Sequence, residues 1–364
     1  MRHIGSGHEA ARAARFSQCR GIRLRGMDAL TRRALTEADV AGLVELENAA
    51  READGDAAHR TGGDGIRGKL NEPLGTPDLG DYSGFFDGDR LVASGRLVRR
   101  GTADPMHYMR SEAFIHPEYR GRGLGTLVLR WMVELAPRVH ERYFPGAPLE
   151  LGAWVPAAHT AARELFEAEG FEPVRYMFAM RRPQDAPAVR AVAPGGLEFV
   201  RFTPELSEPI FDLHMLAFQD HWRGTRQTPE TWAALIRGAS FRPELTFVLR
   251  DPAADRLAGY LVASENAAAT EAAGTRDAHF DLIGTHRDYR RRGVASALIA
   301  RAVEESRAQG YATASLGVDA ASPTGAFSVY ERAGFRPARK NVVYGRVLIE
   351  PVPSGHVRLG DDAA

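Results

Sequence analysis

The sequence predicts an α/β protein built from two tandem copies of one domain, each a central sheet flanked by helices. One reason is length: 364 residues are enough for two separate cores, because soluble domains commonly span about 100 to 200 residues. The other is internal repetition. A strand, an arginine–glycine turn and a helix occur twice, and the arginines that open the two turns, Arg120 and Arg290, are 170 residues apart.

The remaining elements repeat in the same order in both halves. Periodicity and turn residues predict, in each half, a strand, a helix, a hairpin turn, a strand, a helix, a strand and a helix. In the first half we expect them at 30–35, 37–53, 87–89, 113–115, 124–135, 149–155 and 158–169. In the second half we expect them at 197–202, 204–218, 251–255, 280–283, 294–303, 312–318 and 324–333. A Gly-Phe pair follows the last helix of each half.

Composition shifts mark the boundaries of the two halves. Prolines and a Gly-Gly pair interrupt every periodic pattern at 184–196, which we interpret as a linker between domains at 28–183 and 197–350. Residues 1–27 carry six arginines against one acidic residue and predict a disordered basic tail, in which Cys19 is inert. Residues 351–364 predict a second tail.

Charge and cysteine content exclude several classes of protein. Lys plus Arg (47) equals Asp plus Glu (47), so nothing favours a nucleic-acid partner or an anionic membrane. The longest apolar runs are far short of the roughly 18 to 20 residues that cross a bilayer. A single cysteine forms no intrachain disulfide, and the histidine spacings fit no metal motif, so we expect a cytoplasmic enzyme without a metal.

The arginine–glycine turns indicate phosphate binding. A strand that runs through glycines into a helix leaves several backbone N–H groups unpaired and pointing the same way, at the positive end of the helix dipole. Nearby arginines add charge-assisted hydrogen bonds to the same oxygens. The spacing fits neither a nucleotide P-loop nor a dinucleotide fingerprint.

The pattern Arg-x-x-Gly-x-Gly/Ala between a strand and a helix, followed downstream by an aromatic residue before Gly-Phe, resembles the GNAT N-acetyltransferase family, and the resemblance covers both halves. It implies two GNAT-type domains, each with a mixed, mostly antiparallel sheet. It also implies that the turn binds the pyrophosphate of acetyl-CoA and that backbone at 283–285 binds its pantetheine arm. The cofactor-binding residues implied in the second half are Ile283, Gly284, Thr285, Arg290, Arg291, Arg292, Gly293, Val294, Ala295 and Ser296. Those implied in the first half are Arg120, Gly121, Arg122, Gly123 and Gly125.

Acetyl transfer to an amine requires a group that takes the amine proton and a donor that protonates the departing thiolate, but no protein nucleophile. The resemblance assigns the donor role to Tyr330. The first half has Phe166 in this place, and a phenyl ring has no proton to give. We therefore expect catalysis in the second half, with the first half acting as a scaffold or a non-catalytic acyl-CoA-binding domain.

The group that removes the amine proton is open between His279 and Asp281. The strand period predicts that both share one face with Ile283 and Thr285, the expected pantetheine contacts. His279 has the more suitable starting pKa, whereas Asp281 is better suited to hold an ammonium group.

The acceptor amine is expected near Asp220, His221 and Trp222, which combine charge with aromatic surface. The favoured function is an acetyl-CoA-dependent N-acetyltransferase acting on a small primary amine by direct attack in a ternary complex, as a monomer or homodimer. The alternatives are a non-catalytic acyl-CoA-binding regulatory protein and an enzyme that acetylates protein N-termini or lysines.

Overall fold

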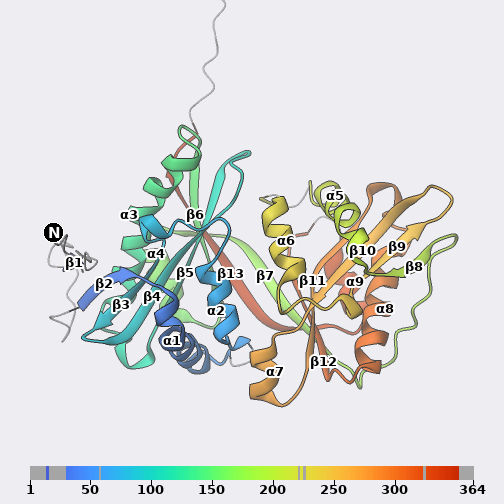
Figure 1. Ribbon diagram of the computed structural model, residues 1–364, viewed down its shortest axis with the longest axis horizontal. Helices are drawn as coiled ribbons and strands as arrows, with labels where there is room; N and C mark the ends of the chain where they lie inside the picture. The colour runs from blue at the N-terminus through green and yellow to red at the C-terminus, as the bar shows by residue number, and fades with distance from the viewer. Residues whose placement is uncertain are drawn as a thin grey trace, which may run out of the picture.

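A computed structural model describes residues 14–15, 30–56, 59–219, 222–223, 227–322 and 325–351 (Figure 1). Most of the basic stretch 1–27, including Cys19, and nearly all of 351–364 lie outside these residues, as do Asp220 and His221. None of the described helices is both long and apolar enough to cross a membrane.

The first half contains seven strands and four helices within the described residues. Its strands are β1 (Ala14–Arg15), β2 (Leu30–Ala34), β3 (Tyr82–Asp87), β4 (Arg90–Arg99), β5 (His107–Ile115), β6 (Leu149–Pro156) and β7 (Glu172–Pro183). Its helices are α1 (Val40–Ala53), α2 (Gly63–Leu70), α3 (Leu124–Tyr143) and α4 (Thr160–Ala168).

The second half contains six strands and five helices within the same limits. Its strands are β8 (Glu198–Arg201), β9 (Phe247–Asp251), β10 (Arg256–Ser264), β11 (Asp277–Thr285), β12 (Thr313–Asp319) and β13 (Arg336–Ile349). Its helices are α5 (Ser207–Ala217), α6 (Pro229–Arg237), α7 (Ala267–Ala273), α8 (Val294–Ala308) and α9 (Ala326–Arg332).

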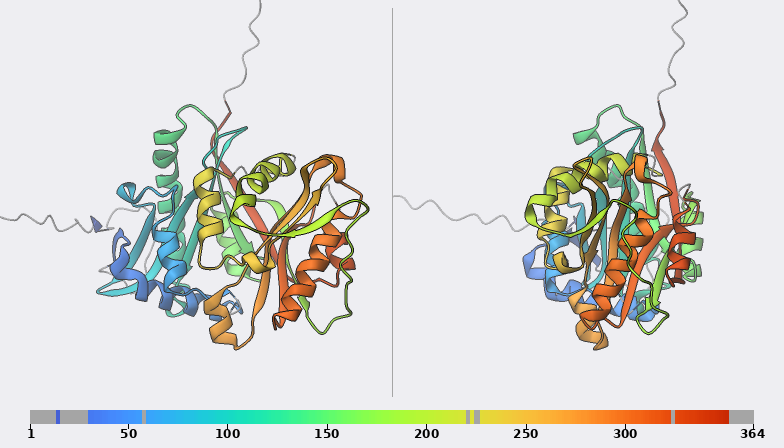
Figure 2. Two further views of the ribbon diagram at one scale, coloured as in Figure 1. Left: turned by 45° about the vertical axis from the view of Figure 1, so that its right-hand side comes forward. Right: turned by 90° about the vertical axis from the view of Figure 1, so that its right-hand side faces the viewer.

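All thirteen strands form one continuous sheet in the order β1-β2-β3-β4-β5-β6-β13-β7-β12-β11-β10-β9-β8. The last strand of each half lies in the other half's part of the sheet: β13 pairs with β6, and β7 pairs with β12. Figures 1 and 2 show these two long strands crossing the middle of the molecule. All neighbours are antiparallel except β5–β6 and β11–β12, which are parallel.

Helices cover both faces of the sheet. On one face, here called the α8 side, α3 packs on the first half and α8 and α9 on the second, and the two largest core clusters form there. The opposite face, the α5 side, is covered by α1 and α2 in the first half and by α5 and α6 in the second. The exchanged strands complete both cores, since Met180 of β7 is buried in the second-half cluster and Tyr344 of β13 in the first-half cluster.

The predicted fold class and the repeated order of elements are confirmed. The sequence prediction missed α2, α6 and α7. Helix α2 contains three glycines and buries only Ile66, so its hydrophobic period is weak, while α7 buries no residue at all.

Candidate active site

The turn that leads into α8 presents a row of unpaired backbone donors. Gly293 forms the N-cap with φ of 84°, and Arg291 also adopts a left-handed backbone with φ of 62°. For a residue with a side chain this conformation costs about 1 kcal/mol. The N–H groups of residues 291–296 have no acceptor within the described part of the chain. Together with the helix dipole, these donors suit a diphosphate, and the exposed side chains of Arg291 and Arg292 flank them.

Side-chain contacts hold this turn in place. The Tyr289 hydroxyl donates to Asp251 at 2.6 Å, and the Arg292 guanidinium lies 5.2 Å from the Tyr289 ring. Arg290 donates to the carbonyl of Ala217, at the end of α5, at 3.3 Å. The structure thus places the Arg290 guanidinium against α5, where it fastens the turn.

Strands β11 and β12 separate beside this turn. Their parallel pairing runs from Asp277–Thr313 to Phe280–Leu316 and then stops, although the strands continue to Thr285 and Asp319. The backbone at 281–285 is therefore unpaired on its β12 side, and polar backbone groups in this gap are available to an extended ligand. Such a gap fits the pantetheine arm expected at 283–285.

A β-bulge lies where the two strands separate. On β10, Val262 pairs with Leu282 but its neighbour Ala263 pairs with Phe280, so Asp281 is the extra residue. A bulge changes which face the following residues occupy.

The bulge makes one sequence prediction wrong. Ile283 packs into the core on the α8 side, whereas Leu282 packs on the α5 side and His279 lies opposite Ser264, away from the α8 core. His279 therefore does not share a face with Ile283 and Thr285, because the bulge interrupts the regular alternation. Gly284 has a packing reason as well: a Cβ there would lie 2.2 Å from the Tyr260 ring.

Tyr330 lies on α9, directly after β12, and packs in the second-half core beside Phe335, with the ring centroids 6.5 Å apart. Its side chain is 9% exposed, and the hydroxyl makes no hydrogen bond to any described residue. Burial raises the pKa of Tyr330 to about 12. The hydroxyl is therefore protonated at neutral pH and able to donate.

His279 and Asp281 lie close together on the α5 side. His279 Nδ1 is 2.9 Å from Ser315 Oγ on β12. Asp281 is hydrogen-bonded to Ser264, and its Oδ2 is buried with no partner among the described residues. Burial raises the pKa of Asp281, and the nearby His279 partly opposes that rise. A carboxylate with a buried, unpaired oxygen can accept a hydrogen bond from a ligand.

The α5 side is open over the middle strands. Gly317 is exposed, with no atom within 4 Å of where a Cβ would stand, and Met177 and Ala179 on β7 are partly exposed. Half-buried Trp222 borders this surface, with the Arg175 guanidinium 5.2 Å from its ring. Trp222 was expected at the acceptor site, and it lies beside this open surface. Asp220 and His221 lie outside the described residues.

The turn before α3 in the first half repeats the geometry. Gly121 and Gly123 have φ of 72° and 86°, and the N–H groups of residues 121–126 have no acceptor among the described residues. The Arg122 guanidinium lies 5.1 Å from the Tyr119 ring. Arg120 is bound at 2.6 Å to Asp54, which follows α1, so it fastens the turn as Arg290 does. Gly125 lets Leu165 of α4 approach closely, since a Cβ there would lie 3.3 Å from that side chain.

The first half differs at the other positions of the site. Strands β5 and β6 also separate, after Arg110–Gly152, but the β4–β5 pairing has no register shift and hence no bulge. Phe166 stacks on Tyr344 with ring centroids 5.7 Å apart. No tyrosine hydroxyl occupies the position that corresponds to Tyr330 within this described helix.

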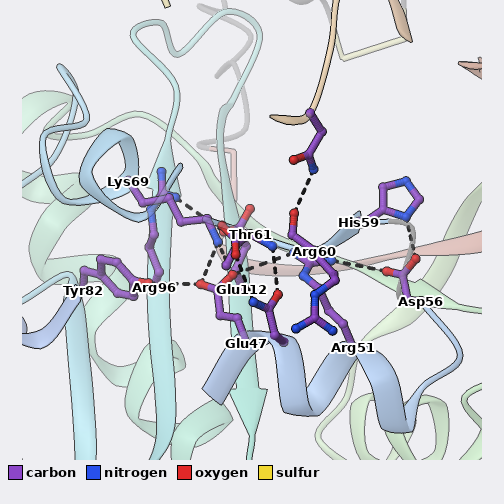
Figure 3. Close-up of polar contacts among 12 residues, drawn as sticks. Glu47, Arg51, Asp56, His59, Arg60, Thr61, Lys69, Tyr82, Arg96 and Glu112 are labelled. Atoms are coloured by element: carbon purple, nitrogen blue, oxygen red, sulfur yellow. Dashed lines mark hydrogen bonds and ion pairs between the residues drawn. The ribbon is translucent and has the colours of Figure 1, made fainter. Parts of the chain in front are cut away.

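A buried charge network lies on the α5 side of the first half (Figure 3). Glu47 of α1 is fully buried, and the Lys69 ammonium binds its two oxygens at 2.7 and 2.6 Å. Figure 3 shows Lys69 and Tyr82 directed toward Glu47, with the Tyr82 hydroxyl at 3.2 Å. Arg96 lies 3.6 Å from Glu112 on β5. The network therefore lies over β3, β4 and β5, beneath α1 and α2.

Sequence reasoning missed several polar residues that the fold brings to the second-half site: Ser264, Asp277, Arg175, Ser315 and Asp319. Ser315 had a signal, because Thr313 and Ser315 alternate with Ala314 and Leu316 and so predict a polar strand face. Within the described ranges, no group of three or more His, Cys, Asp or Glu side chains is placed to hold a metal ion.

Curated relatives and solved structures match nearly the whole chain. The chain is 27% identical to the mycothiol acetyltransferase of Thermobispora bispora, over 85% of this chain and 97% of that protein. It is also 27% identical to the mycothiol acetyltransferase of Clavibacter michiganensis, over 84% and 91%. The crystal structure of a GCN5-related N-acetyltransferase from Sphaerobacter thermophilus superposes with a TM-score of 0.70 at 25% identity, covering 89% of this chain and 97% of that one.

A tandem GNAT protein from the clavulanic acid biosynthesis pathway shares the fold, with a TM-score of 0.65 at 19% identity over 88% of this chain and 99% of that one. The Acetyltransferase (GNAT) family matches twice, at residues 44–171 and 208–335. The chain therefore belongs to the GNAT family of acetyltransferases and is an acyltransferase with two GNAT domains in tandem.

Proposed function

We propose that this acyltransferase moves an acetyl group from acetyl-CoA to the primary amine of a small molecule, and that the second half carries the reaction. One observation supports this choice above the others: the open helix start, the separated strands, the bulge and Tyr330 occur together only in the second half of the described chain. The first half keeps the helix start but has Phe166 and an unbulged β5.

The second half would hold acetyl-CoA through the N–H groups of residues 291–296, the side chains of Arg291 and Arg292, and the unpaired backbone at 283–285. Acetyl-CoA supplies a thioester whose acyl group a neutral amine can take directly. Tyr330 donates its hydroxyl proton to the departing sulfur, and a base on β11, either His279 or Asp281, takes the proton that the amine loses. Proton gain and proton loss then balance without a protein nucleophile.

The acceptor amine would lie on the open α5 side over β7 and β12. This surface borders His279 and Asp281, and Trp222 and Arg175 form its other edge. The relatives are named mycothiol acetyltransferases, so mycothiol-type amines are the first acceptors to test.

Release of free CoA thiol from acetyl-CoA, followed with mycothiol-type and other primary amines, tests the proposal. We expect release only in the presence of an amine, and acetylated amine in equal amount. Tight acetyl-CoA binding with no turnover across the panel would support the acyl-CoA-binding regulatory alternative instead. Turnover with peptides alone would favour a protein acetyltransferase.

A further inference from the structure

Three polar side chains on two neighbouring strands form a hydrogen-bonded chain on the α5 side. Asp277 and His279 are two residues apart on β11, so they lie on one face, and Ser315 is the direct neighbour of His279 on β12. Ser315 Oγ donates to Asp277 Oδ2 at 2.5 Å, and His279 Nδ1 lies 2.9 Å from the same Ser315 oxygen.

The direction of these bonds follows from counting hydrogens. The Asp277 carboxylate accepts at both oxygens, from Thr313 Oγ1 at one and from Ser315 Oγ at the other. A serine hydroxyl has one hydrogen, and Ser315 gives it to Asp277, so its oxygen can only accept from His279. The hydrogen of the neutral imidazole must therefore be on Nδ1, and Nε2 has a free lone pair.

The Nε2 atom of His279 is accessible. It makes no hydrogen bond to any described residue, and it is not among the buried polar atoms that lack a partner. His279 is only half-buried and lies next to the open surface formed by Ala179 and Gly317. An amine bound on this surface can reach Nε2 directly or through one water molecule.

We propose that Asp277 and Ser315 are positioning residues that fix His279 as its Nδ1–H tautomer, so that Nε2 is the atom that takes the proton from the acceptor amine. This inference rests on the proposed function and chooses between the two bases left open there. When Nε2 takes the proton the ring becomes a cation, and the chain through Ser315 connects that charge to the Asp277 carboxylate.

The other charged groups around the ring fit this assignment. Asp281 faces His279 from the same strand and is hydrogen-bonded to Ser264, while its buried Oδ2 has no partner among the described residues and can accept an N–H of the amine. Arg181 of β7 lies 3.7 Å from Asp277 and keeps that carboxylate paired. The neighbouring strand β10 contributes Ser264, which binds Asp281 rather than the ring.

The bulge at Asp281 explains why these hydrogen-bonded side chains occur in only one half of the described residues. In the second half it turns Asp277 and His279 toward the α5 side. In the unbulged strand β5, Met109 and His107 point to the α8 side, where Met109 joins the core and His107 contacts His140 of α3. The described first half therefore has no equivalent of the chain.

The experiment uses the full chain and has two readouts. In the resting protein, ¹⁵N chemical shifts of the His279 ring report the tautomer with no substrate present. We expect the Nδ1–H form in the natural sequence. In Asp277→Asn the side-chain amide can donate to Ser315, which reverses the direction of the hydrogen bonds and moves the ring hydrogen of His279 to Nε2. Ser315→Ala removes the preference for one tautomer, and Ser315→Thr retains it.

The kinetic readout is the pH profile of amine acetylation. Asp277→Asn and Ser315→Ala are expected to lower kcat by about 10- to 100-fold and to shift the acid limb of the profile, with an unchanged KM for acetyl-CoA and recovery in Ser315→Thr. An Nε2–H tautomer in the natural sequence would overturn the inference, as would an acid limb that moves with Asp281→Asn but not with Ser315→Ala. If the protein transfers no acetyl group to any amine, the proposed function fails, but the ¹⁵N chemical shifts of the His279 ring still decide which tautomer is present.

Discussion

Arg175 of β7 forms an ion pair with Asp319 of β12 through the Nε and Nη2 atoms of its guanidinium. Nε lies 2.9 and 3.0 Å from the two carboxylate oxygens, and Nη2 lies 2.8 Å from Oδ2. The same Nη2 donates to the carbonyl of Ala321 at 3.2 Å, in the segment that leads to α9 and Tyr330. A side chain from the last strand of the first half therefore holds the backbone that precedes the proposed acid of the second half.

Removal of Arg175 is expected to destabilise the protein. Asp319 is 5% exposed, and Arg175→Met would leave its buried carboxylate without its cation, at a cost of about 3 kcal/mol in the free energy of unfolding. Urea unfolding measures this directly. The double variant Arg175→Met/Asp319→Leu removes both charges and should recover much of the loss; equal losses in the single and double variants would mean that the ion pair is not the cause.

Tyr330→Phe is expected to lower kcat by about 100-fold or more, because the phenyl ring keeps the packing against Phe335 but has no proton to donate. The KM for acetyl-CoA should change little. Phe166→Tyr is the matched control in the first half and should leave kcat unchanged. Steady-state thiol release measures both variants, and a fully active Tyr330→Phe would remove the assignment.

A negative charge at the start of α8 is expected to repel the cofactor. Ser296 is exposed at the third residue of α8, where a glutamate suits the helix dipole and leaves folding intact, yet opposes a bound diphosphate. Ser296→Glu should therefore raise the KM for acetyl-CoA by about 10-fold or more. Thr126→Glu makes the same change at the start of α3. If catalysis depended on the first half, Thr126→Glu would be the variant that loses it.

His107 predicts a dependence of stability on pH. Its ring is fully buried, with Nδ1 2.8 Å from Nδ1 of His140, and burial, with a smaller contribution from His140, lowers the pKa of His107 to about 4. In the unfolded chain a histidine titrates near 6.5. The contribution of a neutral, buried His107 to stability is thus fully present above about pH 6.5, and about 3 kcal/mol of it is lost as the pH falls toward 4.

Urea unfolding between pH 7 and pH 4 measures this loss. In His107→Asn the titrating ring is replaced by a neutral group that can still donate to His140, so the slope of stability against pH should become shallower by about one proton over this range. Identical slopes in the two proteins would contradict a buried, neutral His107.

The sequence predicted those parts of the fold that follow from local chemistry. The strand, turn and helix around Gly293 and Gly123 were recognisable because glycines, arginines and helical periodicity lie within one short segment. The expected positions of Tyr330 on a helix and Phe166 on its counterpart were correct for the same reason.

The bulge at Asp281 could not be predicted, because it is a property of how β11 pairs with β10 and not of either strand alone. Strict alternation therefore assigned Ile283 to the wrong face. The strand exchange is equally non-local: nothing in residues 172–183 indicates that they pair with β12 rather than with β6. The contact between Arg175 and Asp319 depends on that exchange and was missed with it.

The exchange also bears on how such a molecule can arise and be divided. Cut within 184–196, the chain would give two pieces, one lacking the neighbour of β6 and the other lacking the neighbour of β12. Each piece would bear a strand whose buried side chain, Met180 in one and Tyr344 in the other, belongs to the core of the other piece. Each piece should be insoluble when it is produced alone, and the two should form a soluble complex when they are produced together. The same arrangement would result if two copies of one domain each placed their last strand in the sheet of the other, as in a domain-swapped dimer.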